Sequence, residues 1–450
     1  MKSGLARTLK RTESRCSCFR SPALARSARS YSVVSPSTSG RAESPLAKVL
    51  RDSIKATGPI SVSRYMQWCL SHPVYGYYTQ GDVFGQKGDF ITSPEISQIF
   101  GELMAIWFVT RYIAAGHPKR CRIIELGPGR GTLMADILRT FDQLKSIASS
   151  LKSVHLVENS EKMRAVQSSN LDRFCEERDI AIHWVDRIDD VPPGDEFTFV
   201  VAHEFFDAMP INAFEKAPEG FRELMVDIDP ENGSDSTSCS HSGLRLTRSR
   251  EANSSALLIP ATSPRFAALP IGARVEIAQD SWKIARKIGE MLQRSEPGST
   301  SSSAGGAGLI VDYGADKLFP DSFRAIRKHE IIDVFDSPGE SDLTANVDFA
   351  YLREAIEGTG TSALGPISQG QFLLSLGLQP RLQKLLASNT SPERKQDLIK
   401  GAQRLVDPVF MGSQYQIMGL LSGAGEGAEV YPFPSLVPTA AEPGETRPDS

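Results

Sequence analysis

The sequence has few cysteines and no marked excess of either charge. Its 450 residues include six cysteines, and none forms a Cys-x-x-Cys pair or stands at metal-ligand spacing from a histidine. A disulfide framework or a metal site is therefore not expected, and a reducing compartment fits this composition. The net charge of −4 gives no general basic surface, so a nucleic-acid partner is not expected either.

Long hydrophobic runs are also missing. No uninterrupted apolar stretch reaches the roughly 20 residues that a transmembrane helix needs, so no transmembrane segment is expected. Hydrophobic residues still make up 40% of the chain, which can support a substantial core. The length predicts one large domain or two ordinary ones.

The first 35 residues differ from the rest in composition. Arginine recurs there with serine and alanine, and Glu13 is the single acid. This pattern is typical of a mitochondrial transit peptide and lacks the apolar region of a secretory signal, although a basic disordered arm would look similar. We assign residues 1–35 to a transit peptide, expect cleavage near Ser30 to Val34, and expect a location in the mitochondrial matrix.

One stretch organises the remaining chain. An apolar run ends in Glu125, and a turn with Gly127, Gly129 and Gly131 leads into an amphipathic segment. Glycines there let the backbone approach a ligand and adopt positive φ. The helix start beyond the turn offers free N–H groups and a positive dipole end. This strand, turn and helix predict a site for a nucleotide-like cofactor.

The spacing of the glycines bears on which cofactor is bound. A dinucleotide fingerprint reads G-x-G-x-x-G, whereas this turn reads G-x-G-x-G and follows Glu125. A carboxylate would repel a pyrophosphate but suits a cationic sulfonium cofactor. The turn resembles the first motif of the class I methyltransferases, which implies S-adenosylmethionine with Glu125 facing its ammonium group.

Strands and helices alternate after the turn. Apolar runs lie at 154–157, 180–184, 197–202 and 308–314, and helical patterns separate the first of them. This alternation predicts an α/β fold with a mostly parallel sheet covered on both faces. Glu158 directly follows the run at 154–157. Adenosine binders place an acid at this position, where it accepts hydrogen bonds from the ribose hydroxyls. Glu125, Glu158, Asp186 and Glu204 should all lie at the carboxyl ends of the strands.

Other regions interrupt or flank the alternation. We expect an N-terminal helical region at 45–112, a core at 120–421 and an insertion between strands four and five at about 211–307. Stretches rich in serine and glycine at 230–243 and 298–306 predict flexible loops. Residues 423–450 are rich in proline, glycine, glutamate and alanine, which predicts a disordered tail.

A further helix precedes the glycine turn. Ser93 is placed to cap it, with Pro94 at its first position and apolar residues at helical spacing beyond. Its polar positions include Glu95 and Gln98. This face is either a solvated helix edge or a lid over the cofactor, and we include Pro94, Glu95 and Gln98 among the candidate cofactor-binding residues.

Four strings of sequence together resemble one family. They are 88–98 (GDFITSPEISQ), 125–131 (ELGPGRG), 203–210 (HEFFDAMP) and 342–349 (DLTANVDF). They resemble the MidA family, mitochondrial arginine methyltransferases that assist complex I assembly, and the likeness runs from about Pro45 to Leu421. Asn346 departs from it, because an aspartate is expected there.

The resemblance implies a function. It implies a class I methyltransferase that symmetrically dimethylates the ω-nitrogens of an arginine, using S-adenosylmethionine. The implied partner is the complex I subunit of the peripheral arm near the quinone site. Asp186 stands where the family usually holds the adenine.

Arginine methylation suggests roles for the stretch after the fourth strand. A guanidinium is a poor nucleophile, and carboxylates that grip it can orient its nitrogens. Glu204 and Asp207 are candidates for this task, and His203 is a candidate proton acceptor. The alternatives are that Glu204 orders the loop, that Asp207 caps a helix and that His203 is structural.

Other classes of function remain to be weighed. A dinucleotide oxidoreductase conflicts with the glycine spacing and with Glu125. A non-catalytic complex I assembly chaperone would not need Glu125, Gly127, Gly129 and Glu158 together. A small-molecule methyltransferase is disfavoured by the large insertion and the N-terminal helices, which suggest a shaped surface for a protein partner.

Overall fold

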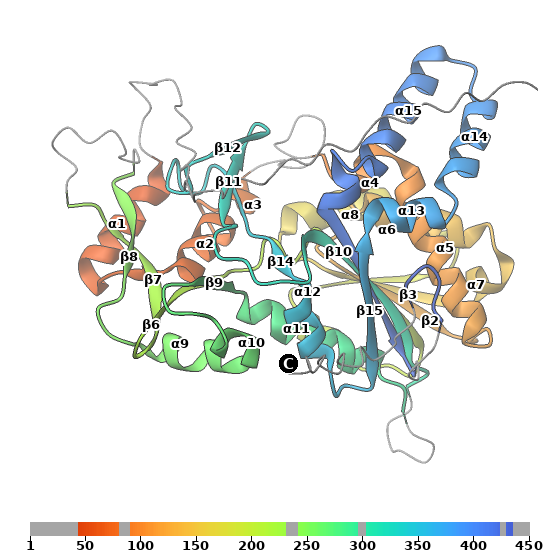
Figure 1. Ribbon diagram of the computed structural model, residues 1–450. Helices are drawn as coiled ribbons and strands as arrows, with labels where there is room; N and C mark the ends of the chain where they lie inside the picture. The colour runs from red at the N-terminus through yellow and green to blue at the C-terminus, as the bar shows by residue number, and fades with distance from the viewer. Residues whose placement is uncertain (1–43, 81–90, 231–241, 296–302, 424–428, 435–450) are drawn as a thin grey trace, which may run out of the picture. The chain divides into compact units, whose positions relative to one another are not determined.

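A computed structural model describes residues 44–80, 91–230, 242–295, 303–423 and 429–434 (Figure 1). The expected transit peptide and most of the two serine- and glycine-rich loops lie outside these residues. No helix in the described ranges is both long and apolar enough to cross a membrane.

The main sheet carries the expected parallel strands. Seven of its strands lie in the order β15-β16-β10-β5-β2-β3-β4, and in the described chain a short β14 also pairs with β10. Among the described strands of this sheet, β16 runs in the direction opposite to the others. The strands are β2 (Cys121–Leu126), β3 (Leu151–Val157), β4 (Ala181–Val185), β5 (Phe197–His203), β10 (Gly306–Ala315), β14 (Val347–Asp348), β15 (Thr361–Ser368) and β16 (Tyr415–Ser422).

Chain order reverses beside β2. The chain moves outward from β2 through β3 to β4, and then returns to place β5 and β10 on the opposite side of β2. Ligands of open parallel sheets bind at such a switch point, beyond the carboxyl ends of the strands. The glycine turn that follows β2 lies at this point.

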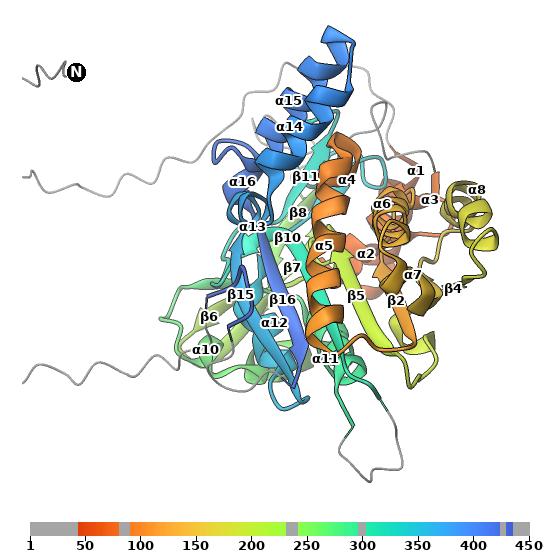
Figure 2. The same cartoon turned by 90° about the vertical axis from the view of Figure 1, so that its right-hand side faces the viewer.

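Helices cover both faces of the sheet, as predicted. Ile123 joins the core formed with α5 (Gln98–Ala114), α6 (Thr132–Asp142), α7 (Lys145–Ser150) and α8 (Glu161–Glu176). Its neighbour Ile124 joins the core on the other face with α11 (Gln279–Leu292) and α12 (Phe349–Ile356), because successive side chains of a strand point to opposite faces. Figure 2 shows α5 lying along one face of the sheet. Although we counted α11 with the insertion, it therefore packs on the main sheet.

The N-terminal region and the insertion share one core. β1 (Ile60–Ser61) pairs antiparallel with β7 (Gly220–Ile228), and the helices α1 (Pro45–Thr57) and α2 (Val62–Ser71) pack on the same side chains. This second sheet also contains β6 (Asn212–Ala217), β8 (Leu244–Arg248) and β9 (Arg274–Ile277). Short helices α9 (Ser254–Leu258) and α10 (Pro264–Ala267) complete the insertion.

The expected N-terminal helical region is interrupted by a short strand, and one predicted helix start was wrong. Ile60 and Ser61 form that strand, and the Ser61 side chain caps α2 by accepting from the Arg64 N–H at 3.1 Å. The helix expected to begin at Pro94, with Ser93 as its cap, is split into α4 (Ser93–Ile96) and α5. Ser93 does not cap it, since its hydroxyl bonds to Oε1 of Gln369 at 3.2 Å.

The chain beyond α12 holds elements that the sequence did not predict. β15 and α15 (Pro392–Val406) were missed, and α15 packs against α4 beside α14 (Leu378–Ser388) (Figure 1).

The other α-helices and strands of the described residues are α3 (Tyr77–Gln80), α13 (Gln369–Ser375), α16 (Met411–Gln414), and the small sheet of β11 (Arg324–Arg327), β12 (Glu330–Ile332) and β13 (Asp342–Thr344).

The prediction of a disordered tail was wrong for residues 429–434. Val430 and Phe433 are buried and belong to the main core. The Phe433 ring lies 6.0 Å from that of Trp107 and 5.9 Å from that of Phe372. Composition alone missed this short apolar anchor, because proline, glycine, glutamate and alanine dominate residues 423–450.

Candidate cofactor and acceptor site

The glycine turn has the backbone that its sequence requires. Gly127, Gly129 and Gly131 have φ values of 63°, 52° and 79°, a region that side chains disfavour. The Gly127 N–H donates to the carbonyl of Val157 at 3.1 Å, which joins the turn to the end of β3.

The three glycines serve two different purposes. A Cβ added at Gly127 would lie 2.9 Å from Cδ2 of Phe205, and one at Gly131 would lie 3.3 Å from Cδ1 of Leu171. At Gly129, no atom of the described residues other than those of its two chain neighbours lies within 4 Å of that position. Gly127 and Gly131 therefore admit neighbouring side chains, while Gly129 alone faces open space that a ligand can enter.

Glu125 presents a carboxylate with one oxygen that has no hydrogen-bond partner among the described residues. The residue is 2% exposed, and the oxygen in question is Oε2. Burial raises its pKa to about 8. Such a group is costly when ionised, and a bound cation would offset that cost.

Glu158 is held in place at the end of β3. Its Oε1 accepts from the Ser160 N–H at 2.8 Å, and its Oε2 accepts from Nε2 of Gln167 at 3.3 Å. Burial raises its pKa, although these two bonds and the charge of Arg164 act in the opposite direction.

Asp186 lies on the surface beyond β4. Its Oδ1 is 2.6 Å from Nη2 of Arg164, whose Nε also donates to the Glu158 carbonyl at 2.7 Å. The arginine therefore links Asp186 to Glu158, the neighbouring acid at this edge of the sheet.

The loop after β5 depends on a residue that we did not predict. Asp312 of β10 is fully buried, and its Oδ2 accepts from the backbone N–H groups of Phe205, Phe206 and Asp207 at 3.1, 2.8 and 3.3 Å. Glu204 precedes these donors and has a φ of 48°. The pattern that marked Glu125, an acid near the end of an apolar strand, was also present at Asp312.

Glu204 is buried at the centre of this loop. Tyr415 donates its hydroxyl hydrogen to Oε1 of Glu204 at 2.9 Å. Burial raises the Glu204 pKa to about 8, and the charges of Asp207 and Glu95 add to the increase. The carboxylates of Asp207 and Glu95 therefore lie near Glu204.

His203 is adjacent but is a weak base. Its Nε2 lies 3.4 Å from Oε1 of Glu204, and its ring packs edge-on against Phe100. Burial lowers its pKa to about 3, so the ring is neutral at physiological pH.

Asp207 has partners of its own. Its Oδ2 accepts from the Thr344 hydroxyl at 2.9 Å, and burial raises its pKa while Thr344 and Arg324 oppose the increase. No helix follows it before β6, so it is not a helix cap. Nη1 of Arg324 donates to Oδ1 of Asn346 at 2.7 Å, so this guanidinium contacts an uncharged amide at position 346.

The candidate lid residues separate into two groups. Pro94 and Glu95 lie in α4, and the influence of Glu95 on the Glu204 pKa places it by the acceptor loop. Gln98 points elsewhere, because its Nε2 donates to Oε1 of Glu102 at 3.1 Å. Glu102 in turn forms a double ion pair with Arg381 of α14, with both N–O distances at 2.7 Å.

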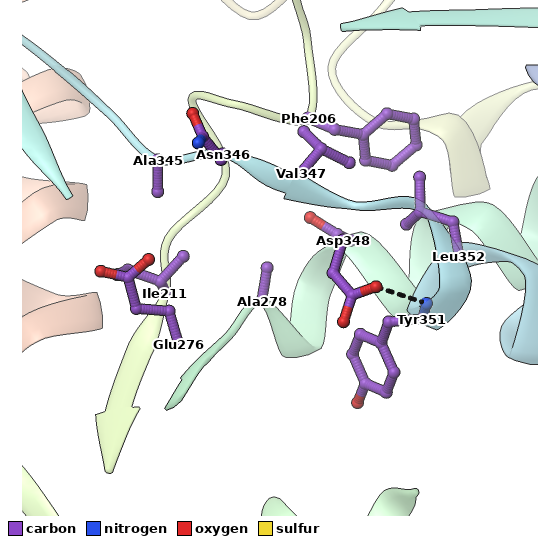
Figure 3. A pocket seen from close by; sticks show the side chains of 11 residues that line it. Phe206, Ile211, Glu276, Ala278, Ala345, Asn346, Val347, Asp348, Tyr351 and Leu352 are labelled. Atoms are coloured by element: carbon purple, nitrogen blue, oxygen red, sulfur yellow. Dashed lines mark hydrogen bonds between the residues drawn. The ribbon is translucent and has the colours of Figure 1, made fainter. Parts of the chain in front are cut away.

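A small cavity lies on the insertion side of the loop. Its volume is about 20 Å³, and its walls include Phe206, Asn346 and Leu352 (Figure 3). That space holds roughly one water molecule. It is too small for a nucleotide-like cofactor or an arginine side chain.

Known proteins resemble this chain in sequence and fold. Residues 103–367 match the family described as "Putative S-adenosyl-L-methionine-dependent methyltransferase". A crystal structure from Burkholderia thailandensis, described as a "likely methyl transferase" bound to S-adenosyl-homocysteine, is 25% identical. Its TM-score is 0.65, with 84% of this chain and 92% of that chain covered.

Two curated relatives carry the name "Protein arginine methyltransferase NDUFAF7, mitochondrial". The one from Rattus norvegicus is 39% identical, with 84% of each chain covered. The one from Homo sapiens is 40% identical, with 84% of this chain and 85% of the relative covered.

The fold and the comparisons define an S-adenosylmethionine-dependent methyltransferase. The residues fit this cofactor, since Glu125 offers an unpartnered buried carboxylate, Gly129 leaves space and Glu158 presents an oriented acid. The chain belongs to the family of the mitochondrial protein arginine methyltransferase NDUFAF7. The resemblance to the MidA family is thereby confirmed.

Proposed function

We propose that this protein methylates the ω-nitrogens of an arginine in a protein substrate, with symmetric dimethylation, in the mitochondrial matrix. We further propose that the substrate is the complex I subunit of the peripheral arm near the quinone site, methylated during assembly. The observation that carries the proposal is the Glu204 carboxylate. It is buried at the switch point of a methyltransferase sheet, and the Tyr415 hydroxyl donates a hydrogen bond to it.

The cofactor side of the proposal rests on β2 and β3. S-adenosylmethionine, when bound, supplies an electrophilic methyl group on a sulfonium. We assign Glu125 to its ammonium group, the backbone at Gly129 to close contact and Glu158 to the ribose hydroxyls. Asp186 is assigned to the adenine end, where Arg164 holds it beside Glu158.

Glu204 is the proposed catalytic residue on the acceptor side. A carboxylate beside the guanidinium orients it and draws positive charge away from the attacking nitrogen. Methylation of a guanidinium nitrogen releases one proton, and a carboxylate with a pKa near 8 can accept it at Oε2 while Tyr415 stays bonded to Oε1. Glu95, which lies near enough to raise this pKa, would add negative charge at the entrance for the guanidinium.

Asp207 and His203 receive lesser roles in this proposal. Thr344 and the nearby Arg324 already engage Asp207, so Asp207 shapes the loop rather than gripping the substrate. A histidine with a pKa near 3 holds protons poorly, so His203 acts as a neutral wall of the site.

The test uses the protein without residues 1–35, S-adenosylmethionine and the purified complex I subunit. Mass spectrometry should find dimethylarginine in the subunit, and fragment ions should identify the symmetric isomer. Monomethyl or asymmetric products would overturn the symmetric assignment alone. Binding of both partners with no methyl transfer would instead favour a non-catalytic assembly chaperone.

A further inference from the structure

We propose that Gln167 is a positioning residue for the cofactor, which locks the Glu158 carboxylate to the glycine turn. It lies on α8, the helix between β3 and β4, and is fully buried. Neither the sequence motifs nor the comparisons single it out.

The Gln167 amide joins the ends of three strands. Its Nε2 donates to the Gly129 carbonyl at 2.8 Å, in the turn after β2, and to Oε2 of Glu158 at 3.3 Å, after β3. Its Oε1 accepts from Nε1 of Trp184 on β4 at 2.9 Å. One side chain therefore fixes the glycine turn and the ribose-binding acid relative to each other.

The orientation of this amide is determined by its partners. Trp184 offers only an N–H donor, so it requires the oxygen of Gln167. The nitrogen must then face the Gly129 carbonyl and the Glu158 carboxylate, both of which are acceptors. Any residue without this donor leaves two acceptors unsatisfied.

Glu158 gains a defined geometry from these contacts. Ser160 occupies Oε1, Gln167 occupies Oε2, and the Asn159 N–H also bonds to the carboxylate, which has about four acceptor positions. The acceptor capacity that remains is held in a fixed direction for hydroxyl donors. The Gln167 bond also favours the ionised form of Glu158 and so lowers its pKa.

Asn170 provides a matched comparison. It lies one turn along α8, and its Nδ2 donates to the Arg130 carbonyl at 2.9 Å, the next carbonyl of the same turn. Its side chain is exposed, whereas that of Gln167 is buried. Asn170 therefore shares the turn-anchoring part of the Gln167 role, without the bonds that tie Gln167 to Glu158 and Trp184.

The experiment is calorimetric titration of S-adenosylmethionine into Gln167→Met, Gln167→Glu and Asn170→Ala proteins between pH 5 and pH 9. We expect Gln167→Met to weaken binding about tenfold at pH 7.5, as loss of a hydrogen bond to a charged group implies. Gln167→Glu should weaken it more, because it keeps the acceptor for Trp184 but adds a negative charge beside Glu158. Asn170→Ala should change affinity less than about threefold.

The pH profile separates orientation of Glu158 from simple loss of packing. Cofactor affinity should fall as pH decreases through the pKa values of Glu125 and Glu158, and in both Gln167 variants only the Glu158 part of that fall should move to a higher pH than in wild type. An unchanged midpoint in both, or an equal loss in Asn170→Ala, would overturn the proposal. If Gln167→Met unfolds, as thermal denaturation will reveal, the Gln167→Glu profile decides alone. The test concerns cofactor binding, so its outcome is independent of the arginine substrate.

Discussion

The hydroxyl of Tyr415 donates a 2.9 Å hydrogen bond to Oε1 of Glu204, a residue 211 positions earlier in the chain. Tyr415 begins β16, and its cross-strand partner Tyr313 packs against it with ring centroids 4.1 Å apart. The last strand of the sheet therefore supports the proposed catalytic carboxylate.

Replacing Tyr415 by phenylalanine should shift the pH dependence of methyl transfer. Burial raises the Glu204 pKa to about 8, and the Tyr415 bond opposes that effect, so its loss should raise the pKa further. Because the ionised carboxylate is the active form, the rate rises with pH, and the midpoint of that rise should move to higher pH in Tyr415→Phe. Initial rates between pH 6 and pH 10 measure this, and an unmoved midpoint contradicts it.

Glu204→Gln should separate binding from chemistry. The amide keeps the shape of the side chain but cannot hold a negative charge or accept the released proton. We expect methyl transfer to fall by about 100-fold or more while the affinity for S-adenosylmethionine stays within about twofold. Calorimetry and a product assay on the same preparation test both parts. Retained turnover would remove Glu204 from the catalytic role.

Glu125→Gln should stabilise the cofactor-free protein at high pH. The folded pKa is about 8 against an ordinary value of 4.5, so the folded state holds the proton more tightly. Between these values the wild-type protein loses stability as pH rises, and the neutral amide removes that loss. The melting temperature of the variant relative to wild type should increase from pH 5 to pH 8.

The same substitution should weaken binding of S-adenosylmethionine, because the ammonium group loses its counter-charge. Glu251→Gln, at an exposed position, is the control and should show neither effect. A melting-temperature difference that is constant with pH would mean that Glu125 titrates normally.

Gly129→Val should abolish detectable cofactor binding without unfolding the protein. The new side chain would enter the open space beside the turn, and the positive φ of 52° adds a strain of about 1–2 kcal/mol. Gly116→Val is the matched control, since Gly116 also has a positive φ of 80° and open space where a side chain would begin. Normal binding by a folded Gly129→Val protein would place the cofactor elsewhere.

Phe433→Ala should destabilise the fold by about 3 kcal/mol, a usual cost for removing a buried phenylalanine ring. The ring is 5% exposed and contacts the core through Trp107 and Phe372. Tyr431→Ala is the control, because Tyr431 is 62% exposed and should cost much less. Urea denaturation measures both, and equal costs would show that Phe433 is not an anchor.

Local patterns predicted the main elements of the fold. Apolar runs of strand length and the glycine turn were sufficient to place β2, β3, β4, β5 and β10. Helix starts were less predictable, since Ser93 looked like a cap but bonds to Gln369 from a distant helix. The packed segment around Phe433 was missed because its partners are not encoded nearby in the chain.

The candidate site was predicted only in part. Glu125, Gly129 and Glu158 could be named as candidates because strand, turn and helix follow one another within a short stretch. Gly127 was named with them, but a glycine is needed there because the Phe205 ring occupies the space of a side chain, and not because a ligand enters that space. Asp312, Tyr415 and Gln167 were missed, although each bonds directly to a predicted site residue or to the backbone that carries it.

The sequence by itself determined the α/β class, the strand–turn–helix unit and the choice of a sulfonium cofactor over a dinucleotide. These depend on the period of apolar residues and on charge and glycine spacing over a few residues. Only the tertiary structure decided how each acid is held and what it can still bind. The ionisation and orientation of Glu204, Asp207 and Glu158 are set by burial and by hydrogen bonds from other elements, which sequence spacing does not encode.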